Sequence, residues 1–208
     1  MYFESFSDLR PGIYTYLGFS GVEEDARTDR LIQSCLAELE KIAHFRYTHK
    51  IYEDPPDFLR REPYASFLRG CMAVAVGVMT LGGETDMAIR RYARTDMERS
   101  VVLSATASAL LESLSDRFEE KFGSERTYRF CPGYGGSSVE DLGEIFRLLQ
   151  PEKIGVTLSE SYFMLPEKSM AGIVGVGKRA RKTCKDCCLL EHCQYRKEGA
   201  TCYRSEKK

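Results

Sequence analysis

The chain has 208 residues, 43% of them hydrophobic and 29% charged, which is typical of a globular protein able to fold around its own core without disulfides. The formal net charge of −1 gives no overall field for nucleic acid or a membrane, and no apolar run reaches the roughly 18 residues of a transmembrane helix. The N-terminus lacks the basic start and apolar stretch of a signal peptide, so we expect a cytoplasmic protein.

The first part of the chain predicts strands, one amphipathic helix and a buried central strand. β-Branched and aromatic residues indicate strands, whereas an apolar stripe of period 3.6 indicates the helix. In chain order we predict a strand at 13–19, a helix at 23–44, a strand at 45–52, a proline-rich loop at 53–64 and a strand buried on both faces at 67–81.

The second part predicts two long helices, a glycine-rich loop and further strands. We expect two helices between 85 and 122 that meet near Thr95-Asp96, a loop at 131–136, a helix from N-caps at Ser137 and Ser138 to Gln150, and strands at 153–164 and 169–177. This order favours an α+β fold with a mixed or antiparallel sheet.

Residues 129–135 read RFCPGYG and form the first candidate ligand site. Pro132 fixes one φ angle, and Gly133 permits backbone conformations closed to other residues, so the backbone can approach a ligand closely. Arg129 at the edge of the loop can clamp a carboxylate or phosphate, and Tyr134 can stack on a flat ring or donate its hydroxyl. An ordinary strand-to-helix turn with a surface arginine is the alternative.

Two further groups of polar residues are candidates. Glu112 lies beside a stripe of small residues on its predicted helix, where a carboxylate can bind a ligand ammonium; a solvated glutamate is the alternative. Ser159, Glu160 and Lys168 fall between two predicted strands, where they line either a cleft or a hairpin connection.

Five of the eight cysteines lie in the last 25 residues. From residue 178 onward there are ten basic and four acidic residues, a net charge of +6, which leaves −7 on residues 1–177. Clustered thiols in a reducing compartment favour a zinc ion or an iron–sulfur cluster, with His192 as a substitute ligand. A redox-sensitive disordered tail is the alternative, and the scarcity of aromatic residues argues against nucleic-acid binding. The candidate metal ligands are Cys184, Cys187, Cys188, Cys193 and Cys202.

Three segments together resemble a known family. They are RFCPGYG at 129–135, IGVTLSE at 154–160 and MLPEKSMAGIVG at 164–175. Their motifs and order are similar to those of the activation domain of cobalamin-dependent methionine synthase, over about residues 67–177. The tail looks like the cysteine ending of free-standing relatives of that domain in anaerobic bacteria.

The resemblance implies a C-shaped α+β fold around a twisted antiparallel sheet that binds S-adenosylmethionine (AdoMet) in a shallow groove. By position in the family motif, Arg129 would hold the ligand carboxylate, Cys131 would contribute backbone contacts, and Gly133 and Tyr134 match the glycine and tyrosine. Glu112 matches the acidic residue on the preceding helix. The family's further acidic residue near the N-terminus and its tyrosine after the last strand have no match that we can place.

The resemblance also implies partners. The family domain docks on a cobalamin domain whose cobalt has been oxidised, and an electron from a flavodoxin- or ferredoxin-type donor with a methyl group from AdoMet restores it. This chain encodes no cobalamin-binding module, so the corrinoid would be carried by a corrinoid-binding protein or by methionine synthase modules on another chain.

The sequence therefore predicts an activation-like domain at 1–177 and a basic, metal-binding tail at 178–208. The first hypothesis is an accessory protein that reactivates a corrinoid methyltransferase with AdoMet. We predict no catalytic side chain, because the reduced cobalt is itself the nucleophile and the protein only positions the reactants. The alternatives are an iron–sulfur reductive activator of a corrinoid protein and a non-enzymatic, zinc-stabilised binding module.

Overall fold

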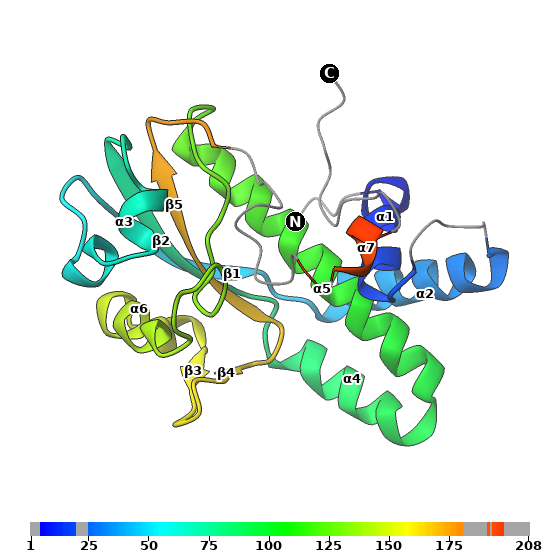
Figure 1. The fold of residues 1–208 in the computed structure, drawn as a ribbon. Coiled ribbons are helices and arrows are strands. Elements are labelled where there is room, and N and C mark those ends of the chain that lie inside the picture. The colour runs from blue at the N-terminus through cyan, green and yellow to red at the C-terminus, as the bar shows by residue number, and fades with distance from the viewer. Residues whose placement is uncertain (1–4, 20–24, 181–190, 192, 198–208) are drawn as a thin grey trace.

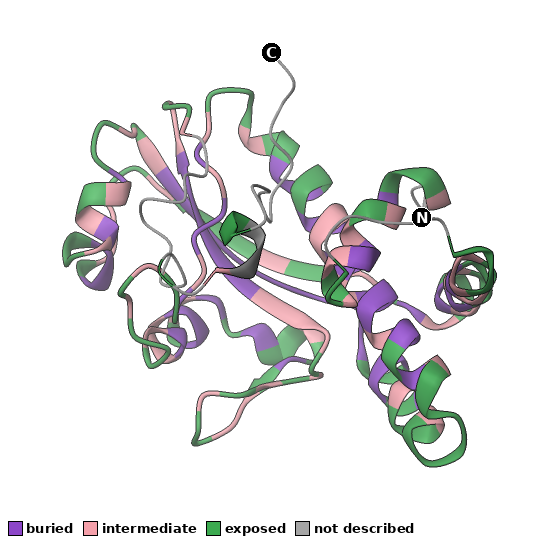
Figure 2. Ribbon diagram, turned by 45° about the vertical axis from the view of Figure 1, so that its right-hand side comes forward, coloured by how far each residue is buried: buried purple, intermediate pink, exposed green. Residues whose placement is uncertain are grey.

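The computed structural model describes residues 5–19, 25–180, 191 and 193–197. Within them the sheet at the centre is antiparallel and has the order β1-β2-β5 (Figure 1). Its strands are β1 (Arg46–Tyr52), β2 (Ala73–Thr80) and β5 (Ser169–Val176). The central strand β2 is buried along nearly its whole length, which confirms the prediction of a strand covered on both faces (Figure 2).

Helices cover both faces of this sheet. On one side α5 (Met97–Glu119) packs with α1 (Phe6–Tyr16), α2 (Ala26–Ile42) and α4 (Gly83–Thr95). The other side is covered by the short 3₁₀ helix η1 (Asp57–Arg60), α3 (Tyr64–Phe67) and α6 (Asp141–Leu149). The remaining elements are η2 (Glu120–Phe122), η3 (Pro151–Ile154), the hairpin strands β3 (Thr157–Leu158) and β4 (Met164–Leu165), and α7 (Gln194–Lys197).

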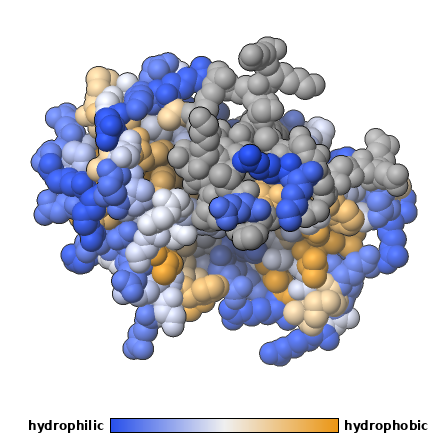
Figure 3. Space-filling view, in the orientation of Figure 1, coloured by the Kyte–Doolittle hydropathy of each residue, from blue (hydrophilic) through white to orange (hydrophobic). Residues whose placement is uncertain are grey.

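Alternation along β2 divides the buried side chains between two hydrophobic clusters. Val74, Val76 and Val78 face the cluster under α6, whereas Met79 belongs to the cluster formed by the helices around α5. A strand's side chains point to opposite faces in turn, so this one strand supplies both clusters. Figure 3 shows a largely hydrophilic surface in which hydrophobic residues form separate patches on both sides of the view.

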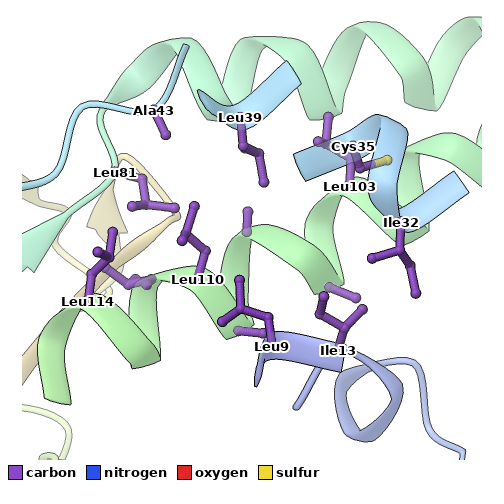
Figure 4. Close-up of a cluster of buried hydrophobic side chains, with 14 of the residues drawn as sticks. Leu9, Ile13, Ile32, Cys35, Leu39, Ala43, Leu81, Leu103, Leu110 and Leu114 are labelled. Atoms are coloured by element: carbon purple, nitrogen blue, oxygen red, sulfur yellow. The ribbon is translucent and has the colours of Figure 1, made fainter. Parts of the chain in front are cut away.

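The strand predicted at 13–19 is wrong, because residues 13–16 belong to the helix α1 and residues 17–19 follow its C-terminus. Leu9 and Ile13 are four residues apart and fully buried, and they point into the same cluster as Leu103 and Leu110 of α5 (Figure 4). Packing of this stripe on α5 decides the conformation, although Pro11 disfavours a helix interior and the β-branched and aromatic residues favour a strand.

Several predicted elements are confirmed with their boundaries. Asp25 caps α2 by accepting the N–H of Arg27, and Asp96 separates α4 from α5 and accepts the N–H of Arg99. The predicted strands at 45–52 and 169–177 correspond to β1 and β5. The α+β class with an antiparallel sheet and flanking helices is therefore confirmed.

Other predicted elements differ in extent. The strand predicted at 153–164 is instead a 3₁₀ turn and a short hairpin, because Gly155 and Tyr162 have positive φ angles that interrupt an extended chain. The helix predicted from Ser137 begins only at Asp141, and the Ser137 hydroxyl accepts the Gly133 N–H within the loop instead. The central strand begins later than predicted, at Ala73, because α3 and a turn precede it.

Two other observations concern membrane-spanning helices and the cysteine-rich tail. None of the helices in the part of the chain that the structure describes is long and apolar enough to cross a membrane. Cysteines 184, 187, 188 and 202 and His192 lie outside the described residues, whereas Cys193 is described and partly buried.

Candidate functional site

The segment before the glycine-rich loop runs along the outer edge of β5 and fixes the position of Arg129. Arg126 pairs with Val176 and Phe130 with Ile173, both in antiparallel bridges. Next to the second bridge, the aliphatic part of the Arg129 side chain crosses Gly172, where an added Cβ would lie 2.3 Å from the Arg129 Cγ. Only glycine leaves room there, so the small residue on β5 aims the guanidinium toward α5.

Three carboxylates on one face of α5 surround this guanidinium. Arg129 Nη1 donates to Glu119 at 2.6 Å, Nη2 donates to Asp116 at 2.8 Å, and Nη2 lies 3.5 Å from Glu112 Oε1. The three acids occur at helical spacings of four and three residues, which places them on one stripe. The Arg129 side chain is only 4% exposed, so the pairs with it are largely shielded from water.

Burial and crowding shift the pKa values of this cluster. Burial raises the pKa of Glu119 to about 7 against the opposing pull of Arg129, and the negative charge of Asp116 adds to the rise. Burial by itself would lower the pKa of Arg129, but Glu119, Asp116 and Glu112 raise it. Burial therefore dominates the shift of Glu119, whereas the surrounding carboxylates dominate the shift of Arg129, which stays charged.

The opposite oxygen of Glu112 is held by α1. The Tyr16 hydroxyl donates to Glu112 Oε2 at 3.1 Å across 96 residues of sequence. Burial first, then the charge and hydrogen bond of Glu112, and then Tyr134 raise the pKa of Tyr16. Glu112 is thus oriented by a phenol on one oxygen and faces a guanidinium on the other, and it is not the fully solvated residue of the alternative interpretation.

The glycine-rich loop lies beside this cluster. Gly133 has φ +88°, and its N–H is bound by the Ser137 hydroxyl, while Tyr134 at the tip is 64% exposed. Cys131 is partly buried and is one of the groups that raise the pKa of Arg129. The structure therefore brings four predicted residues together, namely Glu112, Arg129, Cys131 and Tyr134, with Gly133 shaping the loop.

Sequence reasoning missed three members of the cluster. Asp116 and Glu119 follow Glu112 on the same helical stripe, and this spacing is a signal that could have identified them. Tyr16 had no such signal, because its segment was predicted as a strand and its contact with α5 is long-range.

Ser159, Glu160 and Lys168 do not form a common cleft. The backbone and hydroxyl of Ser159 close the β3–β4 hairpin, which agrees with the hairpin alternative. Lys168 Nζ donates at 2.9 Å to both Ser104 and Ser108, so it meets the small-residue face of α5 about one turn before Glu112.

The described residues contain no group of three or more histidine, cysteine, aspartate or glutamate side chains arranged to hold a metal ion. Since four of the five predicted cysteine ligands fall outside these residues, metal binding by the tail stays a prediction.

Comparison with known proteins identifies the architecture. No protein-family model matches this sequence, and no curated protein matches it. A solved structure described as the crystal structure of the MetH reactivation domain bound to AdoHcy superposes with a TM-score of 0.62 and 16% sequence identity, covering 97% of this chain and 86% of that one. The chain has the MetH reactivation-domain fold.

The family resemblance read from the motifs is thereby confirmed for the fold. A fold shared at 16% identity does not assign side-chain roles, so the ligand-binding roles of Glu112, Arg129, Cys131, Gly133 and Tyr134 stay predictions. The same holds for the domain boundary at residue 177.

Proposed function

We propose that the cluster on α5 and the glycine-rich loop bind AdoMet, and that the protein is an accessory factor that remethylates a corrinoid protein carried on another chain. The observation that carries this proposal is the approach of Arg129 to Glu112, within 3.5 Å, on a chain with the MetH reactivation-domain fold. The solved reactivation domain was bound to AdoHcy, which differs from AdoMet only by the missing methyl group and its charge.

The amino-acid end of AdoMet fits these two groups. It carries an ammonium and a carboxylate on one carbon, and a site that binds it needs an anion and a cation close together. Glu112 supplies the anion; a carboxylate has about four acceptor positions, so the Tyr16 bond does not exhaust it. Arg129 supplies the cation, with five N–H donors in a planar fork.

Access to the buried guanidinium requires an exchange of partners. Glu119 is as buried as Arg129, whereas the Asp116 side chain is 64% exposed and bonded to the outer nitrogen, Nη2. We infer that the ligand carboxylate takes the place of Asp116 on Nη2, while Glu119 keeps Nη1 in position. Asp116 thus holds the position on Nη2 that the ligand carboxylate would take.

The chemistry expected of this chain is positioning. Methyl transfer to the partner's corrinoid uses the reduced cobalt as nucleophile, and the electron comes from a flavodoxin- or ferredoxin-type donor. Glu112 and Arg129 fix the amino-acid end and Tyr134 borders the same site, so the methyl group can be presented to a docked partner without a general acid or base.

Calorimetry with AdoMet tests the binding step. The Glu112→Gln variant keeps the shape and the Tyr16 hydrogen bond but loses the charge, and we expect AdoMet affinity to fall by about 1.5–3 kcal/mol. Glu120→Gln, an exposed acid just beyond α5, is the matched control and should bind as the wild type does. Absence of saturable heat at millimolar AdoMet, or equal affinities of the two variants, would overturn the proposal.

An assay with a purified corrinoid protein tests the transfer. With a low-potential electron donor and AdoMet, the absorbance of methylcobalamin should appear only when this protein is added. If methylcobalamin appears at the same rate with Glu112→Gln, the reaction does not use the site described above.

A further inference from the structure

Tyr16 occupies a place in the candidate site that no motif indicated. It ends α1, whose buried residues Leu9 and Ile13 anchor the helix on α5, and Gly12 lies directly against Ala109 of α5. One helical turn later, the Tyr16 hydroxyl reaches Glu112. The position of the phenol is therefore set by the packing of two helices.

This packing leaves part of the Tyr16 ring exposed. The residue is 50% exposed although its hydroxyl is bonded, so part of an aromatic face borders the site. Tyr134, which is 64% exposed at the tip of the glycine-rich loop, is among the groups that raise the pKa of Tyr16. An exposed aromatic ring, that of Tyr16, thus lies next to the Glu112 carboxylate.

Aromatic faces attract cations within about 6 Å of the ring centroid, because the ring carries negative charge on its faces. In AdoMet the sulfonium is four bonds from the ammonium nitrogen, a separation of roughly 5 Å by ordinary bond lengths. An ammonium bound by Glu112 would therefore bring the sulfonium within reach of the ring whose hydroxyl holds that same carboxylate.

We propose that Tyr16 is a specificity-determining residue of this site, which orients Glu112 with its hydroxyl and favours the ligand's sulfonium with its ring. The inference rests on the proposed function. When the methyl group moves to a nucleophile, the nucleophile supplies the electron pair of the new bond and the C–S pair stays on sulfur. The ligand thereby becomes a neutral thioether and loses the attraction of the ring, so the spent ligand leaves more readily than AdoMet.

Calorimetric titration of the full chain with AdoMet and with AdoHcy tests this inference. For the wild type we expect AdoMet to bind about three- to thirtyfold more tightly than AdoHcy, the range that a cation–aromatic contact supplies. Tyr16→Phe keeps the ring and loses the hydroxyl, so both ligands should weaken by a similar factor and the ratio of affinities should persist. Tyr16→Leu removes the ring, and the ratio should fall to about one.

Two further variants make the outcome unambiguous. Phe19→Leu changes another exposed aromatic residue, just after α1, whose ring contacts Tyr14, and it should leave the ratio unchanged. Tyr16→Trp offers a stronger face and should raise the ratio, which keeps the inference testable if Tyr16→Leu does not fold. A wild-type ratio near one, or a ratio unaffected by Tyr16→Leu and Tyr16→Trp, overturns the inference and leaves AdoMet binding intact. Failure of the wild type to bind either ligand overturns the proposed function as well.

Discussion

Arg129 and the acids around it illustrate how single residues are adjusted by their surroundings. Desolvating the Arg129 guanidinium, which is only 4% exposed, is costly. Its ion pairs with Glu119 and Asp116 offset this cost, because the buried charge then has partners of opposite charge. Burial is also the main reason why the pKa of Glu119 rises.

Glu119 should make stability depend on pH. Because its pKa is raised from 4.5 to about 7, the folded protein binds this proton more tightly than the unfolded chain does. Its contribution to stability is therefore full below pH 4.5 and is lost as the pH rises toward 7, with a slope of at most roughly 1.4 kcal/mol per pH unit. Urea unfolding at several pH values should show this slope in the wild type and in Glu120→Gln, and not in Glu119→Gln.

Gly172 should tolerate no side chain. In Gly172→Ala the new Cβ would meet the Arg129 stem at 2.3 Å, so the arginine must move away from its carboxylates, and we expect a loss of about 1–3 kcal/mol in unfolding free energy together with weaker AdoMet binding. Gly77 on β2 pairs with Gly172 in register, and a Cβ there would meet only ordinary contacts, 3.7 Å or longer. Gly77→Ala is thus the control, and an equal loss in both variants would show that crowding of Arg129 is not the cause.

At the scale of elements, α1 shows tertiary packing overriding local preference. Its sequence contains Pro11 and several β-branched and aromatic residues, yet the segment is helical because Leu9, Ile13 and Tyr14 are buried on one side. The Tyr14 hydroxyl also donates to Asp29 of α2, which links the two helices.

Replacing the proline in α1 should stabilise the protein. Pro11 lies beyond the first turn of the helix, where it has no N–H for the carbonyl of Ser7 and its ring crowds that carbonyl. Pro11→Ala restores the hydrogen bond, and after the greater entropy of the unfolded chain is subtracted we expect a gain of about 1–2 kcal/mol. A higher midpoint of thermal unfolding would support the helix, whereas a lower one would indicate that Pro11 is needed in an extended segment.

At the scale of the whole molecule, α5 connects the hydrophobic core to the candidate site. It packs against α1, α2 and α4, and its C-terminal half carries the acids that surround Arg129 (Figure 1). Charge is divided as well, since residues 178–208 carry a net charge of +6 and residues 1–177 a net charge of −7.

The cysteine-rich tail should bind metal independently of the candidate AdoMet site. We expect the purified full chain to hold zinc, which leaves it colourless, or an iron–sulfur cluster, which absorbs visible light. Replacing Cys184 and Cys187 together by serine should lower the metal content while AdoMet affinity is retained. Cys71→Ser changes a thiol outside the tail and should leave the metal content unchanged; equal metal content in all three proteins would refute a tail site.

The sequence alone determined the elements whose cause is local. Asp96 stands where two helices were predicted to meet, the β-branched run of β2 is buried on both sides, and the glycines between 131 and 136 form the loop, because caps, patterning and φ preferences act over a few residues. The motif residues also led to the right fold class.

Only the tertiary structure decided how the site is assembled. Tyr16 meets Glu112 across 96 residues, and Arg129 reaches α5 because β5 offers Gly172 at the crossing point. Such contacts depend on the packing of α1, α5 and β5 against one another, and no local propensity encodes which surfaces meet. For the same reason the strand predicted at 13–19 became a helix: burial against α5 outweighed the preferences of its own residues.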